Sequence, residues 1–241
     1  MRTAGMDAAL LLHPRDVLYY AGTSRPASLL VALPSRPSAA PTAVLFARRA
    51  LDHVREEATV ERVELMEGFS SVTKAVADAG LTAGVLGIAL DVTPAHLYQR
   101  LMETFAGWEL SDVSPLVLDQ RMVKDEGEIA ATRRAAAVAD AAHRHLPRVA
   151  VSGMSELALA AEVERAMRLT GHEGFQPLRH PGGRGGGVFL MSGPNLTVRG
   201  GHGLVVTGAG LSAGSPYGAS RRTLCSGDLI VLDTGTTRDG Y

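Results

Sequence analysis

The sequence predicts two successive domains, an α/β domain over residues 1–119 and an α+β domain over residues 120–241. Three observations support this fold class. Strand-like and helix-like segments alternate through the first half of the chain, which is typical of an α/β domain. A long alanine-rich segment follows from Lys124, and the remaining chain is rich in glycine and strand-like runs. Helices followed by strands are typical of an α+β domain.

In the first half, apolar runs bounded by proline and glycine predict strands, and amphipathic runs predict helices. The predicted strands are 7–12, 28–33, 42–47, 60–66, 84–90 and 108–114, and the predicted helices are 50–58, 70–80 and 93–106. Thr93 is expected to cap the last of these helices, with Pro94 at its first position. Leu97, Leu101 and Phe105 form its apolar stripe.

In the second half, residues 124–146 predict a long helix whose acidic start suits the helix dipole, and Pro147 is expected to end it. The apolar stripe of this helix contains Ala131, Ala135, Val138, Ala142 and Leu146. A second helix should begin at Ser155 and end at Gly171, with Leu159, Val163 and Met167 on its buried face. Strands are predicted at 186–193, 203–208 and 228–235.

The composition excludes several classes of protein. Apolar residues make up 46% of the chain, enough for a sizeable core, and the formal net charge of -1 gives no reason to expect nucleic acid or an anionic membrane as partner. No apolar run is long enough to span a membrane, and the run near the N-terminus is too short for a signal peptide. The single cysteine, Cys225, cannot form an intrachain disulfide, so we expect a cytoplasmic protein.

Several motifs have an ordinary structural interpretation. The glycine run 182–187 precedes a strand and lacks the lysine of a phosphate-binding loop, which favours a flexible turn. His172, His180 and His202 lie in the glycine-rich half, where loops could build a site, but a single histidine is more often an ordinary hydrogen-bonded residue. Cys225 is expected in a turn before the last strand, as an ordinary thiol.

Asp233 is the strongest candidate for chemistry. It follows the apolar run Leu229 to Leu232, and a carboxylate at the end of a buried strand is costly unless it has a partner. Two interpretations stay open on these residues alone. Asp233 could hold a metal or act as an acid, or it could cap a turn by accepting hydrogen bonds from nearby amides.

Four segments together resemble the creatinase and Xaa-Pro peptidase branch of metallopeptidase family M24. They are "DAALLLHPRDVLYYAG" (7–22), "RMVKDEGEIAATRRAAAVADAA" (121–142), "SGMSELALAAEVERAMRLTG" (152–171) and "SGDLIVLDTGTTRDGY" (226–241). The resemblance implies a creatinase-type N-terminal domain followed by a pita-bread domain, a curved antiparallel sheet backed by helices. It covers the whole chain but only the N-terminal portion of the family's domains.

The resemblance also implies a centre of two divalent ions, usually manganese, cobalt or zinc, held by two aspartates, one histidine and two glutamates. Asp233 matches the first aspartate; Asp239 does not match the second, which would lie beyond Tyr241. With four of five ligands missing, we expect this chain by itself to hold no dinuclear centre and to lack peptidase activity. Family likeness further implies a peptide substrate and a homodimer, while the catalytic and substrate-binding residues of this chain stay unassigned.

One departure bears on the activity. Many resembled enzymes carry a histidine upstream of the first aspartate, where this chain has Pro216 and Tyr217, and neither supplies imidazole chemistry. Three functions therefore stay open: an Xaa-Pro peptidase-like hydrolase that removes N-terminal residues, an inactive homologue that binds a peptide or protein, and a creatinase-like amidinohydrolase.

Overall fold

The computed structural model describes residues 1–34, 40–179, 184–200 and 207–241, which fall into two compact units. The first unit contains Met1–Val123 together with Leu178 and Arg179, and the second contains the other described residues from Lys124 to Tyr241. The domain boundary that we predict at residues 119/120 falls within a helix, Ser114–Met122, and stays a prediction.

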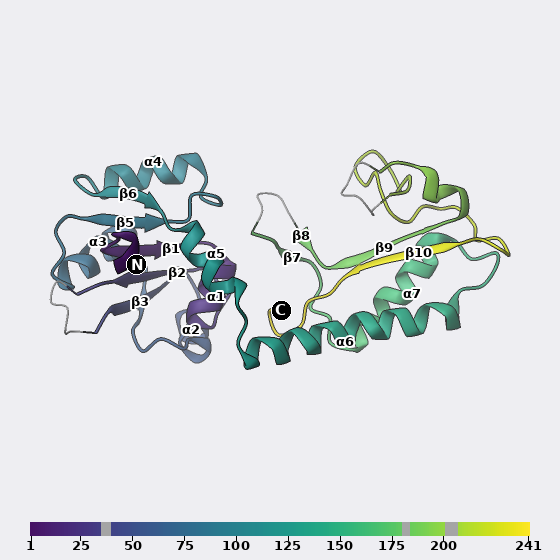
Figure 1. Cartoon of the computed structure of the whole chain (residues 1–241), viewed down its shortest axis with the longest axis horizontal. Helices are drawn as coiled ribbons and strands as arrows, with labels where there is room; N and C mark the ends of the chain where they lie inside the picture. The colour runs from purple at the N-terminus through teal and green to yellow at the C-terminus, as the bar shows by residue number, and fades with distance from the viewer. Residues whose placement is uncertain (35–39, 180–183, 201–206) are drawn as a thin grey trace. The chain divides into compact units, whose positions relative to one another are not determined.

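The first unit is built on a six-stranded sheet with the order β4-β3-β2-β1-β5-β6 (Figure 1). The strands are β1 (Ala8–Leu11), β2 (Ala27–Ala32), β3 (Thr42–Ala47), β4 (Val63–Leu65), β5 (Val85–Ile88) and β6 (Glu109–Asp112). Strand β1 pairs antiparallel with β2 and parallel with β5, and β5 pairs parallel with β6. The carboxyl ends of β1, β5 and β6 therefore meet at one edge of the sheet.

Helices cover both faces of this sheet, which explains why its inner strands β1, β2, β3 and β5 are nearly continuous apolar runs, whereas the edge strands β4 and β6 carry charged residues. The helices are α1 (Pro14–Ala21), α2 (Leu51–Glu57), α3 (Phe69–Asp78), α4 (Ala95–Thr104) and α5 (Ser114–Met122), after a short 3-10 turn, η1 (Arg2–Ala4). Alternate residues of β1 enter different cores, since Ala9 and Leu11 pack with α1, α2 and α5, whereas Ala8 and Leu10 pack with α3 and α4.

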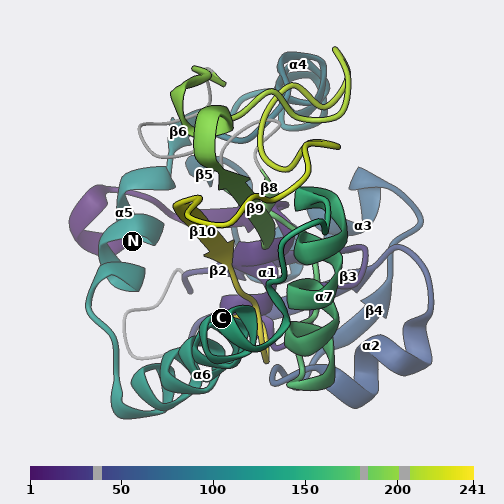
Figure 2. The same ribbon diagram turned by 90° about the vertical axis from the view of Figure 1, so that its right-hand side faces the viewer.

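The second unit places two long helices behind a β-ribbon. Its elements are α6 (Glu126–Val149), α7 (Glu156–Leu169), β7 (Gln176–Pro177), β8 (Arg184–Gly185), β9 (Gly187–Ser192), η2 (Gly193–Thr197) and β10 (Ile230–Gly235). Strands β9 and β10 pair antiparallel, and α6 and α7 pack on one side of them (Figures 1 and 2). Asp125 and Glu128 form a reciprocal capping box at the start of α6.

Most predicted elements are confirmed, and so are the buried stripes of α6 and α7, except that Leu146 in the α6 stripe is only partly buried. Two details are wrong. Pro147 lies inside α6, which continues to Val149 because a proline removes only one backbone hydrogen bond and the amide of Ala150 still donates to the Leu146 carbonyl. The helix expected at Thr93 begins at Ala95, because the Thr93 hydroxyl donates to the Ala89 carbonyl and caps nothing.

Some segments differ from the predictions in other ways. Helices α1 and α5 are additions to the predicted elements, and both carry a proline in their first turn. Most of the strand predicted at 203–208 lies outside the described residues, as does the start of the glycine run 182–187. Within the described part of the chain, no helix combines the length and the apolarity that crossing a membrane requires.

Candidate functional site

The β9–β10 ribbon has two different faces. Val188 and Leu190 of β9 and Leu232 of β10 pack against α6 and α7. Side chains alternate along a strand, so Phe189 and Asp233 point to the opposite face. These two residues are direct partners across the ribbon, which places the Asp233 carboxylate beside the Phe189 ring.

The Asp233 carboxylate is partly exposed on this open face. It accepts no hydrogen bond and joins no ion pair from the residues that the structure describes. The turn-capping role belongs instead to Asp228, whose Oδ2 accepts from the Cys225 amide at 2.7 Å and from Arg222 Nη1 at 2.7 Å. Asp233 is thus available to a ligand, whereas Asp228 is already bonded.

The described residues do not fit a complete metal centre. Across residues 1–34, 40–179, 184–200 and 207–241, no group of three or more histidine, cysteine, aspartate or glutamate side chains is close enough to hold an ion. Asp233 is therefore a single candidate metal ligand, and the other described residues do not complete a metal site around it.

An aromatic pair borders Asp233. The Tyr217 ring lies with its centroid 5.9 Å from that of Phe189, at an interplanar angle of 46°. Gly218 favours this contact, because a Cβ atom at this position would lie 3.3 Å from Phe189 Cδ1 and its positive φ of 84° suits glycine. Pro216, the other residue at the position of the family's histidine, is exposed. Among the residues that the structure describes, the face that carries Asp233 is therefore bordered by aromatic carbon rather than by imidazole.

Behind this face, Glu156 in the first turn of α7 is fully buried. Its Oε1 accepts from the amide and hydroxyl of Ser192, both at 2.7 Å. Its Oε2 accepts from the Ser220 amide at 2.9 Å, the Ser220 hydroxyl at 2.6 Å and Asn195 Nδ2 at 2.8 Å. Burial alone would raise the pKa of Glu156, but the hydrogen bonds from Ser220 and Ser192 outweigh it and lower the pKa below its ordinary value of 4.5.

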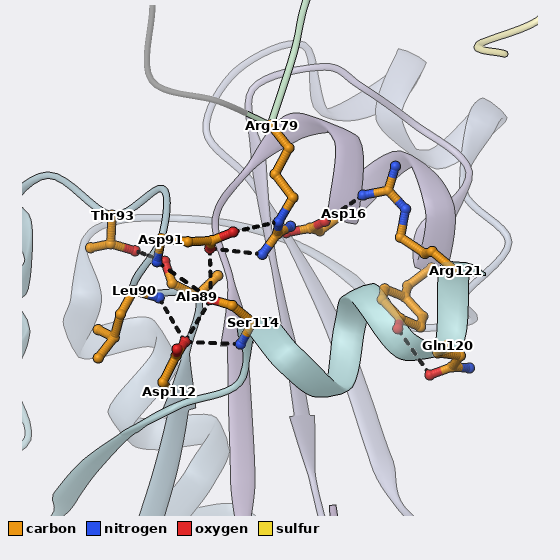
Figure 3. A network of polar contacts seen from close by, with 11 residues as sticks. Asp16, Ala89, Leu90, Asp91, Thr93, Asp112, Ser114, Gln120, Arg121 and Arg179 are labelled. Carbon is orange, nitrogen blue, oxygen red and sulfur yellow. Dashed lines mark hydrogen bonds and ion pairs between the residues drawn. The ribbon is translucent and has the colours of Figure 1, made fainter. Parts of the chain in front are cut away.

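A second polar network lies at the carboxyl edge of the parallel strands in the first unit (Figure 3). Asp16 follows β1, Asp91 follows β5, and Asp112 ends β6. The guanidinium of Arg179 donates to both oxygens of Asp91, at 2.9 and 3.0 Å, and to Asp16. Arg121 Nη1 donates to the other oxygen of Asp16 at 3.1 Å. Asp16 is fully buried, so two arginines neutralise it where water is excluded.

The electrostatics of this network keep its charges in place. Burial opposes the charge of Arg179, but the hydrogen bonds to Asp91 and Asp16 outweigh burial and raise the pKa of the guanidinium. Asp112 behaves similarly: burial would raise the pKa of its carboxyl, and the hydrogen bonds from Ser114 and the Leu90 amide lower it. Every carboxylate here has donors at short range, which is the arrangement of a structural clamp.

The remaining sequence candidates are separate from Asp233. His172 is buried, and its Nδ1 lies 3.1 Å from the Thr237 amide, as expected of a hydrogen-bonded histidine. Asp239 pairs with Arg134 at 2.7 Å. Cys225 lies in the turn before β10, as predicted, and its thiol is exposed rather than buried or half-buried as expected. His180 and His202 lie outside the described residues.

Sequence reasoning missed Glu156 and the network around Arg179. A signal was present for the network, since Asp91 follows the predicted strand 84–90, Asp112 lies towards the end of the predicted strand 108–114, and parallel strands bring such residues to one edge. Nothing local distinguishes Glu156 from an ordinary acidic residue in the first turn of a helix, because its partners lie 36 to 64 residues away.

Comparison with known proteins places the chain in a family. Residues 1–123 match the creatinase/prolidase N-terminal domain, and residues 130–241 match metallopeptidase family M24. The chain belongs to metallopeptidase family M24. The predicted fold class, an α/β creatinase-type domain followed by an α+β pita-bread domain, is confirmed by the structures that it resembles.

Among curated M24 relatives, the uncharacterized peptidase YqhT of Bacillus subtilis is 27% identical over 240 residues, covering 98% of this chain and 59% of that protein. The probable dipeptidase PepE of Mycobacterium tuberculosis is 30% identical over 118 residues, covering 48% of this chain and 24% of that protein. The chain thus spans less than two thirds of the length of these relatives.

Solved structures share the fold. An X-Pro aminopeptidase from Thermotoga maritima superposes with a TM-score of 0.74 at 22% identity, covering 97% of this chain and 59% of that structure. A prolidase from Pyrococcus furiosus superposes with a TM-score of 0.72 at 20% identity, covering 99% of this chain and 64% of that structure. Asp233 lies within the residues that match the M24 metallopeptidases.

Proposed function

We propose that this chain is part of an Xaa-Pro peptidase-like, metal-dependent hydrolase that removes N-terminal residues from peptides. The observation that carries the proposal is the Asp233 carboxylate, which lies unbonded on the open face of β10 within the residues that match the M24 metallopeptidases. The relatives named as X-Pro aminopeptidase and prolidase support the choice of peptide substrates.

The proposed cofactor is a pair of divalent ions, manganese, cobalt or zinc, to which Asp233 donates one carboxylate. In two-metal hydrolases such ions activate water and stabilise the charge of the transition state. Asp233 is suited to bind a cation because no described residue already neutralises it, and carboxylate oxygens bind such ions well.

We further propose a cytoplasmic homodimer. The single cysteine supports a reducing compartment, because the chain can be stable without an internal disulfide. The homodimer rests on the resemblance to the family.

A second candidate function, an inactive homologue that binds a peptide or protein, is favoured by one observation. Pro216 and Tyr217 occupy the position where many resembled enzymes carry a histidine, and Tyr217 packs on Phe189 as an aromatic side chain would in a binding surface. A pure binding function requires no imidazole at this position.

The test uses the complete gene product that contains this chain. We expect the wild type to retain about two manganese ions per chain after dialysis and to hydrolyse an Xaa-Pro dipeptide. Asp233→Asn should lose tightly held manganese and most of its turnover. The matched control is Asp239→Asn, which changes a nearby carboxylate that pairs with Arg134 at the surface and should keep both properties.

Two outcomes would contradict the proposal. An Asp233→Asn variant that keeps its manganese and its turnover would exclude Asp233 as a ligand. A wild-type protein that binds peptide but neither retains manganese nor hydrolyses it would establish the binding function instead.

A further inference from the structure

Among the described residues, Glu156 differs from the buried carboxylate of Asp16 in the groups that donate to it directly, and the nearest arginine, Arg222, reaches it only through the Ser192 hydroxyl, to which its Nη1 donates at 2.7 Å. Asp16 is held by two arginines, whereas the donors to Glu156 in the described residues are all neutral: two serine amides, two serine hydroxyls and one asparagine amide. Such donors stabilise a buried negative charge only while they stay in place. The carboxylate therefore fixes the segments that carry them.

The two carboxylate oxygens hold different segments. Oε1 binds Ser192 at the end of β9. Oε2 binds Asn195 of η2 and Ser220, which lies in the connection that returns the chain to β10. The amide of Leu157 also donates to the Ser220 carbonyl at 3.1 Å. The first turn of α7 therefore binds Ser220 both through the Glu156 carboxylate and through a backbone amide.

The Oε2 side leads to the face that carries Asp233. Asn195 Nδ2, already bonded to Oε2, also donates to the Gly218 carbonyl at 3.4 Å. Gly218 and the adjacent Tyr217 lie against Phe189, which is the cross-strand partner of Asp233. Ser220 is three residues along the chain from Tyr217, and the Gly218 amide between them also donates to the Thr207 carbonyl at 2.8 Å. We expect a shift of Ser220 to be passed along this short segment to the Tyr217 ring.

We infer that Glu156 is a positioning residue: through Oε2 it holds the 217–220 segment so that the Tyr217 ring packs on Phe189 and walls the Asp233 face. Any effect of the Tyr217 ring on substrate binding rests on the proposed function, but the effect of Glu156 on the position of the Tyr217 ring does not. Glu156 touches neither Asp233 nor the open face, and it acts through Ser220 and Asn195.

The chain offers a matched pair of variants. Ser192→Ala and Ser220→Ala each remove one hydroxyl donor to Glu156 and each keep the backbone amide donor. A residue that only stabilises the fold should respond to both changes alike. If Glu156 positions Tyr217 through Oε2, Ser220→Ala should displace the Tyr217 ring and Ser192→Ala should not.

The measurement is fluorine NMR of the chain labelled with 3-fluorotyrosine. The chain has five tyrosines, and the Tyr217→Phe variant identifies the resonance of Tyr217. We expect Glu156→Gln and Ser220→Ala to shift the Tyr217 line by more than its width and to leave the lines of Tyr19 and Tyr20 in the first unit in place. Ser192→Ala and the exposed Glu162→Gln on the same helix should leave the Tyr217 line unmoved.

A Tyr217 line that is unmoved by Ser220→Ala, or moved equally by Ser192→Ala, would overturn the inference, even where Glu156→Gln does not fold. The NMR experiment needs neither metal nor substrate, so its result tests the positioning role of Glu156 independently of the proposed function. Where the complete gene product is active, Ser220→Ala should raise KM roughly tenfold with a smaller change in kcat, because the wall is displaced and the metal ligands are not.

Discussion

Replacing Arg179 by alanine should destabilise the first unit strongly, although the residue lies far along the chain from the strands that it joins. The change removes a guanidinium whose side chain is only 12% exposed and which donates to Asp16 and twice to Asp91. It leaves Asp16 fully buried with Arg121 as its remaining cation.

The magnitude follows from the burial of these groups. Removing one member of a buried ion pair costs about 3–5 kcal/mol when the other charge is left without a partner. Arg121 still neutralises part of Asp16, and Asp91 is 35% exposed and can recover water, so we expect about 3 kcal/mol. For a unit of this size that corresponds to a decrease in Tm of roughly 10 °C.

Thermal unfolding followed by near-ultraviolet circular dichroism measures this effect, because Trp108, the only tryptophan, lies in the first unit. The control is Arg144→Ala, which breaks an exposed pair with Asp140 at 3.8 Å and should cost less than about 0.5 kcal/mol. Arg179→Lys should fall between the two, because an ammonium cannot bond both carboxylates as the guanidinium does. An Arg179→Ala variant no less stable than Arg144→Ala would refute the reasoning.

Three further predictions concern the rest of the chain. Glu156→Gln should lower the free energy of unfolding by about 3 kcal/mol near neutral pH. Because folding lowers the pKa of Glu156, the difference in stability between the two proteins should shrink as the pH falls below about 4.5. Urea unfolding midpoints of both proteins from pH 3 to 7 measure this difference. Pro147→Ala should stabilise the second unit by about 1 kcal/mol in urea unfolding, because it restores a backbone donor inside α6; a loss of stability would contradict this. Limited digestion with a protease of broad specificity should cut first between Val117 and Lys124, where we place the domain boundary, and first cleavage confined to β5 would contradict this boundary.

The sequence was sufficient to predict elements whose residues follow one strong period. Ala131, Ala135, Val138 and Ala142 recur at helical spacing, and all four are buried along α6. Helix α1 is a different case, because it directly follows the strand 7–12 and its residues include two adjacent tyrosines that suit a strand equally well. Its helical state depends on Pro14 in the first turn and on packing against β2.

Pro147 shows why local rules misplace the ends of helices. A proline within a helix is costly in isolation, but the cost is tolerated here because α6 packs against α7 on both sides of the proline through Ala142, Leu146 and Val149. Tertiary contacts of this kind involve residues far away in the sequence and cannot be read from the neighbours of Pro147.

The carboxylates of this chain show what the sequence does and does not specify about a site. The local sequence singles out Asp233, which follows the apolar run Leu229 to Leu232, but it does not distinguish Asp16 or Glu156 from ordinary acidic residues. The structure separates them by their bonding. Asp16 and Glu156 are fully buried, and both oxygens of each carboxylate accept hydrogen bonds, so each carboxylate connects segments that lie far apart in the sequence. Asp233 is partly exposed and has no donor among the described residues, and an unbonded carboxylate on a rigid strand is what a cation or a polar ligand can bind. The two saturated carboxylates therefore stabilise the fold around the face on which the third is left available.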